Sequence, residues 1–432
     1  MKILVAGWDS GGGVEAVQTV VGRAVARGHQ VRVLGTEGLR SRFESAGATF
    51  LRYRYAPDND MRQPETDLVK DWESRNPVTQ WTRVRDRILC GPAREFCRDV
   101  AEELRREPTD VTVIDTMIPA AMFGAEVTGV PAVIVMHGPY MVPRPEIPPL
   151  GTSLMPAKGP LGRLRDRSAA TVTQAVFRTW MPPLNRVRAE AGLPPVGDLP
   201  GLMARADRVL VCSSPSYDFG SGAVPANVRY VGPQLDDDPG EGSGEWRTDE
   251  PGQPLVLVGL SSTVMRQEGL LQRAADALGQ LPVRGLVTTG PAVDPALISA
   301  PGNVTVTRWV RHADVLPHCS AVITHGGHGT VMKALIAGVP LVLVPLGRDQ
   351  PDNAGRVVYA GAGIRLRRNT SARTLQTAIG RVIDDPRYRT AARQMAARLA
   401  SERDDNRVVD ELEQVAARGS ATDHPIPREA DN

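Results

Sequence analysis

The residues with the clearest chemistry lie where a short apolar segment runs into a glycine-rich turn. Residues 321–324 are apolar and mostly β-branched and predict a buried strand, and residues 331–337 predict the amphipathic helix that follows. A turn between a strand and a helix directs free backbone N–H groups and the positive end of the helix dipole to one point, which favours a bound phosphate. Glycines let the backbone approach such an anion, and hydroxyl and imidazole groups can donate hydrogen bonds to it. The residues expected to do so are His325, Gly327, Gly329 and Thr330.

An aromatic residue and an acidic–amide pair stand on either side of this turn. Trp309 precedes the turn and offers a flat face on which a nucleotide base could stack, and Asp349 and Gln350 follow it. The end of a helix alone is worth only about 0.3 to 1 kcal/mol toward an anion, so several donors must act together. In this order, the three groups predict a binding site for a nucleotide-activated sugar.

At these residues the sequence resembles the inverting nucleotide-sugar glycosyltransferases with two Rossmann-like domains, the family that glycosylates natural products such as macrolides and other antibiotics. The resemblance implies that Trp309 stacks on the donor base and that Val310 offers its backbone to the edge of that base. It also implies that the glycine-rich turn holds the diphosphate, together with Ser262 in an earlier loop. Asp349 and Gln350 are expected, by the same resemblance, to contact the hydroxyls of the sugar.

One position departs from the family pattern. Many plant members have a Glu for the ribose hydroxyls where this chain has Lys333. The departure argues against UDP and favours a donor without a 2′-hydroxyl, such as a dTDP-deoxysugar. No metal ion is expected, because no Asp-x-Asp pair follows a strand in the donor half. The helix dipole, Thr330 and His325 would then stabilise the departing diphosphate.

The catalytic base cannot occupy its usual place in the family. Many members supply a histidine in the first loop, at the position that Gly13 takes here. Two expected strands end at Asp115 and His137, and neighbouring strands lie about 4.8 Å apart, so these side chains are expected to form a hydrogen-bonded dyad. In the resemblance, Asp115 falls where the family keeps the Asp that orients its base. Asp9 in the first loop, or a mechanism without a protein base, are the alternatives.

Large apolar side chains gather in the long loops of the first half, which include the proline-rich segments 56–81 and 138–163, and in its mid-chain helix: Trp72, Trp81, Met117, Tyr140, Met141, Met155, Phe177 and Trp180. Loops of that length in a compact domain are usually functional or mobile. Since only 4% of the residues are aromatic, this gathering predicts a pocket for an apolar aglycone. The residues expected to contact the acceptor are Trp72, Tyr140 and Met141.

The elements that must position these residues alternate between strand and helix from the first residue onward. This predicts an α/β fold with parallel sheets covered on both faces, and 432 residues exceed one typical core. Together with the family resemblance, this leads us to expect two Rossmann-like domains that face each other across a cleft (GT-B type). The expected strands are residues 3–6, 30–34, 111–115, 132–136 and 209–212, then 255–260, 285–288, 304–307, 321–324, 341–344 and 363–366.

The domain boundaries follow from the composition and from the resemblance. Residues 234–254 are rich in Asp, Gly, Glu, Ser and Pro and predict a linker between an acceptor domain (1–233) and a nucleotide-sugar domain (255–402). Residues 403–418 are expected to form a helix that crosses back to the first domain, as in the family. Residues 419–432 are polar and are expected to be a disordered tail.

Composition excludes several classes of partner. The net charge is +2, with 51 basic and 49 acidic residues, so nucleic acid is not an expected partner. No apolar run approaches the roughly 20 residues of a membrane span, no signal-peptide pattern is present, and the four cysteines show no metal-ligand spacing. We expect a cytoplasmic enzyme without a cofactor, either a monomer or a homodimer, whose partners are a nucleotide-sugar donor and an apolar acceptor.

Three alternative functions stay open at this point. Gly11, Gly13 and Ala16 after the first strand, with Glu37 beyond, weakly match the pattern of an NAD(P)-dependent oxidoreductase. A non-catalytic homologue that binds a nucleotide sugar would explain the missing histidine of the first loop. An epimerase acting on nucleotide sugars would use a similar donor site without an aglycone.

Overall fold

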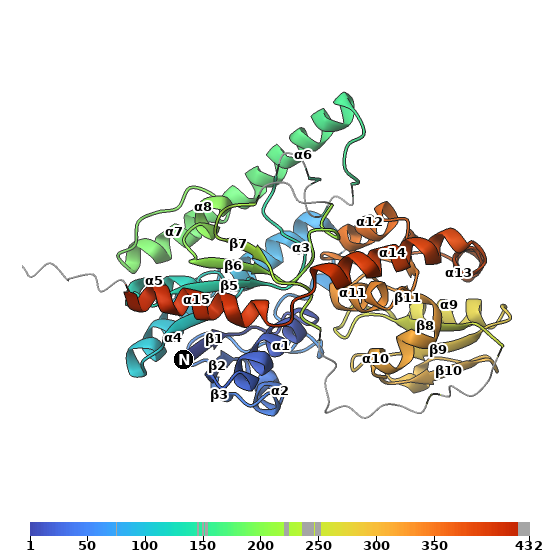
Figure 1. The fold of residues 1–432 in the computed structure, drawn as a ribbon, viewed down its shortest axis with the longest axis horizontal. Coiled ribbons are helices and arrows are strands. Elements are labelled where there is room, and N and C mark those ends of the chain that lie inside the picture. The colour runs from blue at the N-terminus through green and yellow to red at the C-terminus, as the bar shows by residue number, and fades with distance from the viewer. Residues whose placement is uncertain are drawn as a thin grey trace, which may run out of the picture.

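The computed structural model describes residues 1–74, 76–144, 147–148, 151, 154–219, 224–235, 246 and 252–421. Two α/β units lie side by side, the first coloured blue to green and the second yellow to orange (Figure 1). Each unit contains a parallel sheet, which confirms the predicted fold class. The predicted linker (234–254) and tail (419–432) lie largely outside the described residues, and the exact domain boundaries stay predictions.

Within the described residues, the first sheet has seven strands in the order β3-β2-β1-β4-β5-β6-β7, and all neighbouring pairs are parallel. The central strands are nearly continuous apolar runs, as expected for a sheet with both faces covered. The strand order reverses between β1 and β4, and ligands bind outside the carboxyl ends of strands at such a point. The strands are β1 (Lys2–Ala6), β2 (Gln30–Gly35), β3 (Thr49–Arg52), β4 (Val111–Asp115), β5 (Ala132–Met136), β6 (Arg208–Val211) and β7 (Val228–Tyr230).

Helices cover both faces of the first sheet. They are α1 (Gly13–Ala26), α2 (Arg40–Ser45), α3 (Pro77–Val84), α4 (Ala93–Arg106), α5 (Ala121–Thr128), α6 (Pro160–Arg178), α7 (Met181–Glu190), α8 (Leu199–Met203) and, from the end of the chain, α15 (Arg407–Ala421). Successive residues of a strand point to opposite faces. Leu4 and Ala6 of β1 therefore pack in a core with α4, α5, α7 and α8, whereas Ile3 and Val5 pack in a core with α1 and α15.

The second sheet has six strands among the described residues, in the order β10-β9-β8-β11-β12-β13, again all parallel. The strands are β8 (Leu255–Gly259), β9 (Arg284–Thr288), β10 (Val304–Thr307), β11 (Cys319–Thr324), β12 (Leu341–Leu343) and β13 (Gly363–Arg365). The helices are α9 (Glu268–Leu278), α10 (His312–Val315), α11 (His328–Ile336), α12 (Gln350–Tyr359), α13 (Ala372–Asp384) and α14 (Pro386–Glu402). Buried residues of α9 and α13 share one core, and those of α11, α12 and α14 share the other.

The last helix, α15, returns to the first unit, where it lies as the red helix across the strands in Figure 1. Its apolar residues recur at helical spacing and are buried against α1, β4 and β6: Val408, Val409, Leu412 and Val415. Arg208 of β6 also donates to the Glu411 carboxylate at 2.7 Å. The end of the chain therefore ties the second unit to the first.

The sequence prediction places most strands within two residues of their observed positions but does not include β3 and β7. These strands are only four and three residues long and lie at the two edges of the first sheet. Short edge strands bury few side chains, so they leave little periodic pattern in the sequence.

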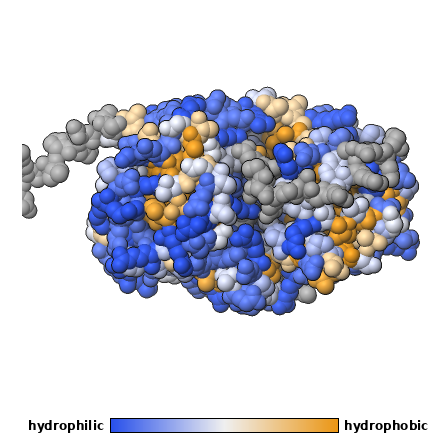
Figure 2. All heavy atoms as spheres, turned by 90° about the horizontal axis from the view of Figure 1, so that it is seen from below, coloured by the Kyte–Doolittle hydropathy of each residue, from blue (hydrophilic) through white to orange (hydrophobic). Residues whose placement is uncertain are grey.

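The face shown in Figure 2 is mostly hydrophilic, with small apolar patches between polar residues. In the described part of the chain, no helix combines the length and the hydrophobicity that a bilayer span requires. The four cysteines, Cys90, Cys97, Cys212 and Cys319, are buried and unpaired.

Candidate active site

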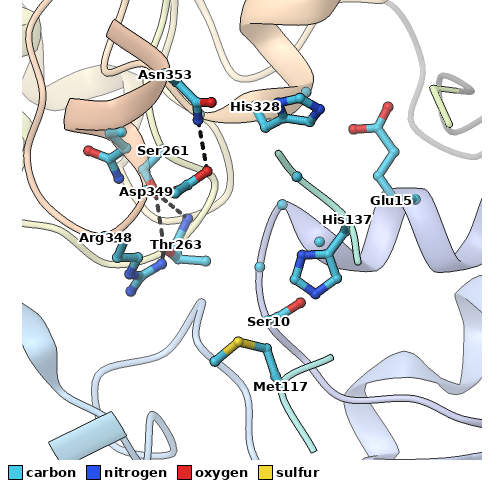
Figure 3. A pocket seen from close by; sticks show the side chains of 18 of the residues that line it. Ser10, Glu15, Met117, His137, Ser261, Thr263, His328, Arg348, Asp349 and Asn353 are labelled. Atoms are coloured by element: carbon cyan, nitrogen blue, oxygen red, sulfur yellow. Dashed lines mark hydrogen bonds between the residues drawn. The ribbon is translucent and has the colours of Figure 1, made fainter. Parts of the chain in front are cut away.

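The carboxyl ends of the two sheets face each other across a cavity of about 720 Å³. The start of α1 and the loops after β4 and β5 line it from the first unit, and the loops after β8, β9, β10, β11 and β12 line it from the second. Figure 3 shows His137 and Ser10 on one side and Asp349, Arg348 and Thr263 on the other. All the predicted donor residues line this cavity: Ser262, Trp309, Val310, His325, Gly327, Gly329, Thr330, Asp349 and Gln350.

The glycine-rich turn connects β11 to α11, which begins at His328 and not at the predicted residue 331. Gly326 has a φ of 96°, and a side chain on it would come within 3.0 Å of the backbone oxygen of Gln350. The first N–H groups of α11 have no partner inside the helix, so they are available to an anion in the cavity that Gly329 and Thr330 line. We call residues 325–330 the anion turn.

His325 begins the anion turn as a buried, uncharged side chain. Burial, together with the positive charge of Arg348, lowers the pKa of His325 to about 3. The imidazole is therefore neutral at pH 7 in the absence of a ligand, and it can act on a phosphate through a hydrogen bond. Its Nδ1 atom lies 3.4 Å from the hydroxyl of Thr324.

Three other predicted donor residues surround the anion turn. Trp309 follows β10 and is half-buried at the cavity wall, which suits a residue expected to stack on a base. The side chain of Val310 is buried in the core, so its backbone is the part that could meet a base edge. Ser262 is exposed, between Ser261 and Thr263, whose hydroxyls lie 2.9 Å apart. The structure gathers these residues on the donor side, and their roles stay predictions.

The two residues of the acidic–amide pair after β12, Asp349 and Gln350, make different contacts. Gln350 is 2% exposed, and its Oε1 accepts hydrogen bonds from the backbone N–H groups of Leu346 at 2.8 Å and Gly347 at 3.1 Å. This amide therefore shapes its own loop. Asp349 accepts a hydrogen bond from Asn353 Nδ2 at 2.8 Å and borders the cavity. Asp349 is the better placed of the two to meet a sugar hydroxyl.

On the opposite wall, the structure forms the dyad that strand order predicts. β4 and β5 are neighbours, and His137 Nε2 lies 3.1 Å from Asp115 Oδ1. The same Asp115 oxygen accepts a hydrogen bond from the backbone N–H of Met117 at 2.8 Å, which fixes the carboxylate. With Nε2–H donating to Asp115, the lone pair of the neutral ring lies on Nδ1. His137 lines the cavity, whereas Asp115 lies behind it.

Two opposing influences set the pKa of His137. Burial lowers the pKa, but the charge of Asp115 and its hydrogen bond outweigh burial, so the pKa is raised above the usual 6.5. The side chain of Asp115 is fully buried and that of His137 is 17% exposed. A histidine held by a buried carboxylate, with one nitrogen left for a substrate, can act as a general base.

The absence of a side chain at Gly13 leaves room beside the first loop for a histidine from another strand. An ideal Cβ atom on Gly13 would lie 2.8 Å from both Cε1 and Nδ1 of His137. A side chain at position 13 and the ring of His137 therefore exclude each other. His137 reaches from β5 into the space beside the first loop, where the family resemblance places a histidine.

Asp9, the alternative base, is buried in the first loop. It is 3% exposed, and its Oδ1 accepts a hydrogen bond from the backbone N–H of Gly11 at 3.1 Å. Burial raises the pKa of Asp9. Asp9 is not among the described residues that line the cavity, whereas His137 is.

Of the predicted acceptor residues, Met141 lines the cavity, but Trp72 and Tyr140 do not. Trp72 lies at a second, smaller pocket, where its indole N–H donates to Asp67 at 2.9 Å and Arg266 covers its ring. Tyr140 is 4% exposed and packs in the core beneath the loop after β5. The sequence pattern correctly locates the apolar segments but cannot show which side chains turn inward.

Aromatic and sulfur-containing side chains, Met141 among them, form the apolar wall of the cavity. Trp81 of α3 meets Phe177 of α6 edge to face at 6.1 Å between ring centroids, and Phe177 meets Trp180 at 4.6 Å. These three residues line the cavity together with Met117 and Met141. Such a surface suits an apolar ligand.

Sequence reasoning also missed two ion pairs that cross the cavity. Arg348 donates through Nε and Nη2 to the two oxygens of Asp71, at 2.7 and 2.9 Å. Lys333 Nζ lies 2.5 Å from Glu15 Oε1. Arg348 is adjacent to the predicted site residue Asp349, and this adjacency is the sequence signal for the first ion pair. A periodic pattern does not show which charged residues from distant segments come into contact.

Comparison with known proteins is consistent with this geometry. Residues 273–415 match the family model described as "Erythromycin biosynthesis protein CIII-like, C-terminal domain". The chain is 32% identical over 411 residues to 4′-demethylrebeccamycin synthase of Lentzea aerocolonigenes, which covers 93% of this chain and 95% of that protein. It is 25% identical over 416 residues to UDP-glucuronosyltransferase 2B7 of Homo sapiens, covering 86% of this chain and 76% of that protein.

Solved structures share the fold over nearly the full length. The calicheamicin glycosyltransferase CalG4 superposes with a TM-score of 0.71 at 24% identity, covering 96% of this chain and 98% of that one. The glycosyltransferase VinC, solved in complex with dTDP, gives a TM-score of 0.70 at 18% identity, covering 97% and 100%. With the full-length relative and the paired α/β units, these likenesses show that the chain belongs to the family of natural-product glycosyltransferases with the GT-B fold.

Proposed function

We propose that this glycosyltransferase transfers a sugar from a dTDP-activated donor to a hydroxyl of an apolar aglycone, with inversion and without a metal ion. One observation supports the proposal above all: two chemically distinct groups line a single cavity from opposite sides. The His137–Asp115 dyad belongs to the first unit, and the anion turn belongs to the second. A base that faces a leaving-group site is the arrangement that a single displacement requires.

The dyad would supply the base in this displacement. Nδ1 of His137 takes the proton of the acceptor hydroxyl while the acceptor oxygen attacks the anomeric carbon of the sugar. The new C–O bond forms on the face opposite the diphosphate, and the C–O bond to the diphosphate breaks, so the configuration at that carbon inverts. Asp115 stabilises the resulting imidazolium through its hydrogen bond to Nε2.

The anion turn would stabilise the leaving diphosphate. Negative charge grows on the phosphate oxygens as the C–O bond breaks, and donors that are already in place stabilise that charge. The N–H groups at the start of α11, the hydroxyl of Thr330 and the neutral ring of His325 are such donors. Among the described residues, no group of three or more His, Cys, Asp or Glu side chains is placed to hold a metal ion, and the proposal assigns this task to the protein donors.

The preference for dTDP rests on Lys333. A deoxyribose lacks the 2′-hydroxyl that a Glu at this position would bind in the resembling family. VinC was solved with dTDP and the spinosyn rhamnosyltransferase SpnG with thymidine diphosphate. UDP is the second candidate, since the likeness to UDP-glucuronosyltransferase 2B7 favours it.

The aromatic wall of Trp81, Phe177 and Trp180 supports an apolar aglycone. A nucleotide-sugar epimerase would leave this wall without a role, so the geometry favours transfer to an acceptor. The oxidoreductase is set aside, because the chain belongs to a glycosyltransferase family. The hydrogen-bonded pair of His137 and Asp115 favours a catalytic protein over a non-catalytic homologue.

Thermal unfolding with dTDP, UDP, GDP and NADPH tests the donor. A ligand at 100 times its Kd stabilises the folded state by about 2.7 kcal/mol, which is easily measured. We expect the largest rise in Tm with dTDP, and a rise with NADPH alone would contradict the proposal. Transfer assays with dTDP-sugars then test the chemistry, because nuclear magnetic resonance of the product shows whether the anomeric configuration is inverted or retained.

A further inference from the structure

The ion pair between Glu15 and Lys333 joins the two units inside the cavity. Glu15 lies in the first turn of α1 and Lys333 on α11, and their charged atoms are 2.5 Å apart. Both residues line the cavity, with side chains 28% and 15% exposed. Figure 3 shows the Glu15 side chain extending from α1 beside His137 and toward the His328 side of the pocket.

The second oxygen of Glu15 lies against the anion turn. An ideal Cβ atom on Gly329 would be 3.3 Å from Glu15 Oε2. Gly329 is the second residue of α11, where the unpaired N–H groups and the positive end of the helix dipole attract an anion. The carboxylate of Glu15 therefore occupies the neighbourhood in which the proposed function places the diphosphate.

The ammonium of Lys333 is within reach of the same place. Gly329 and Lys333 are four residues apart on α11, so they lie on one face of the helix. A lysine side chain has a flexible stem and three N–H donors, so its ammonium can change partners without movement of the helix. Glu15 and a diphosphate oxygen would compete for that ammonium, because both are anions at the start of the same helix.

We propose that Lys333 is a ligand of the nucleotide diphosphate, and that Glu15 holds its ammonium and partly fills the diphosphate site until the donor binds. The proposal rests on the proposed function, because it takes the anion turn as the diphosphate site. Donor binding then exchanges one anion for another on Lys333. Because Glu15 belongs to the first unit, this exchange also removes one contact between the two units.

Calorimetric titration of dTDP tests the exchange with two single variants. Glu15→Gln removes the competing charge, so dTDP should bind about two- to fivefold more tightly than to the wild type. Lys333→Met removes a charged donor and leaves the Glu15 carboxylate facing the phosphates, so binding should weaken at least about tenfold. Glu44→Gln and Lys2→Met make the same charge changes at residues that do not line the described cavity, and they should leave the Kd unchanged.

The double variant separates the competing charge from the lost donor. Glu15→Gln in the Lys333→Met background should recover part of the lost affinity, because the repelling carboxylate is gone. A crystal structure of the dTDP complex should show Lys333 Nζ within hydrogen-bond distance of a phosphate oxygen and Glu15 displaced.

Two results overturn the inference: weaker dTDP binding by Glu15→Gln, which would make Glu15 a ligand of the nucleotide, or an unchanged Kd in Lys333→Met. Both differ from failure of the proposed function, in which the wild-type protein would bind neither dTDP nor UDP.

Discussion

The donor and acceptor sides of the cavity differ in how their residues are spread along the chain. Nearly all the donor residues lie between Trp309 and Gln350, inside the segment 273–415 that matches the family model. The acceptor side is lined by residues that range from Trp8 to Cys212 and come from several helices and loops. One half of the site is therefore a local pattern in the sequence, and the other half is assembled only by folding.

The difference follows from the ligands. A diphosphate is the same chemical group in every nucleotide sugar, so one strand, one turn and one helix can bind it. An aglycone varies in shape, and loops on a rigid scaffold provide that variety. The proposed base, His137, belongs with the second half, because it reaches from β5 to the space that the absent side chain of Gly13 leaves open. In the proposed mechanism, the reacting nitrogen stays beside the first loop although its residue comes from another strand.

The largest effect should come from removing the base on the acceptor side. His137→Ala should lower turnover by about 10² to 10⁴-fold, because it removes the group proposed to accept the acceptor proton. The substitution leaves the donor-side residues unchanged, so the Kd for dTDP should equal that of the wild type in calorimetry. His318→Ala, which removes an exposed histidine away from the cavity, serves as the control. Near-normal turnover in His137→Ala, together with loss of turnover in Asp9→Asn, would show that the base is Asp9 in the first loop.

The pH dependence tests the second member of the dyad. The pKa of His137 is raised, and the neutral ring is the active form, so kcat/KM should fall as the pH drops through a value above 6.5. Asp115→Asn removes the negative charge that raises this pKa, so the acid limb should move to lower pH. Turnover on the plateau should fall less than in His137→Ala. An acid limb that stays in place in Asp115→Asn would show that another group titrates.

The sequence predicts the fold and the gathering of the donor-side residues at one cavity for a physical reason. A buried parallel strand is a run of apolar residues, and a phosphate-binding turn needs glycine, a hydroxyl and a helix start in consecutive positions. Both are properties of short segments. The hydrogen-bonded pair is also predictable, because Asp115 ends β4, His137 directly follows β5, and the common Rossmann order makes these two strands neighbours.

The acceptor side resists prediction because side-chain direction depends on distant contacts. Trp72 and Tyr140 lie in the predicted segments, yet one packs against Arg266 of the second unit and the other packs in the core. The ion pairs of Arg348 with Asp71 and of Lys333 with Glu15 join residues more than 250 positions apart. No local pattern encodes such pairs.

On the donor side, removal of the Trp309 indole ring should weaken dTDP binding more than removal of any acceptor-side side chain does. Trp309→Ala should weaken dTDP binding by about 1 to 3 kcal/mol, or roughly 5- to 150-fold, if the base stacks on the indole. Trp72→Ala removes the same side chain outside the cavity and should leave the Kd for dTDP unchanged. Calorimetry with both variants measures the contrast, and equal affinities in the two would remove Trp309 from the site.

The smallest effect should come from the apolar wall, where several side chains share the contact with the aglycone. Trp81 contacts Phe177 and Trp180, so the wall persists in part when one ring is removed. An aromatic contact contributes about 0.5 to 1.5 kcal/mol beyond area burial, so Trp81→Ala should raise the KM for the acceptor about two- to tenfold, with dTDP affinity unchanged. Steady-state kinetics at saturating donor measure this change, with Trp72→Ala as the matched control. If Trp72→Ala raises the acceptor KM and Trp81→Ala does not, the aglycone lies against the second pocket, and the sequence pattern locates it better than the cavity does.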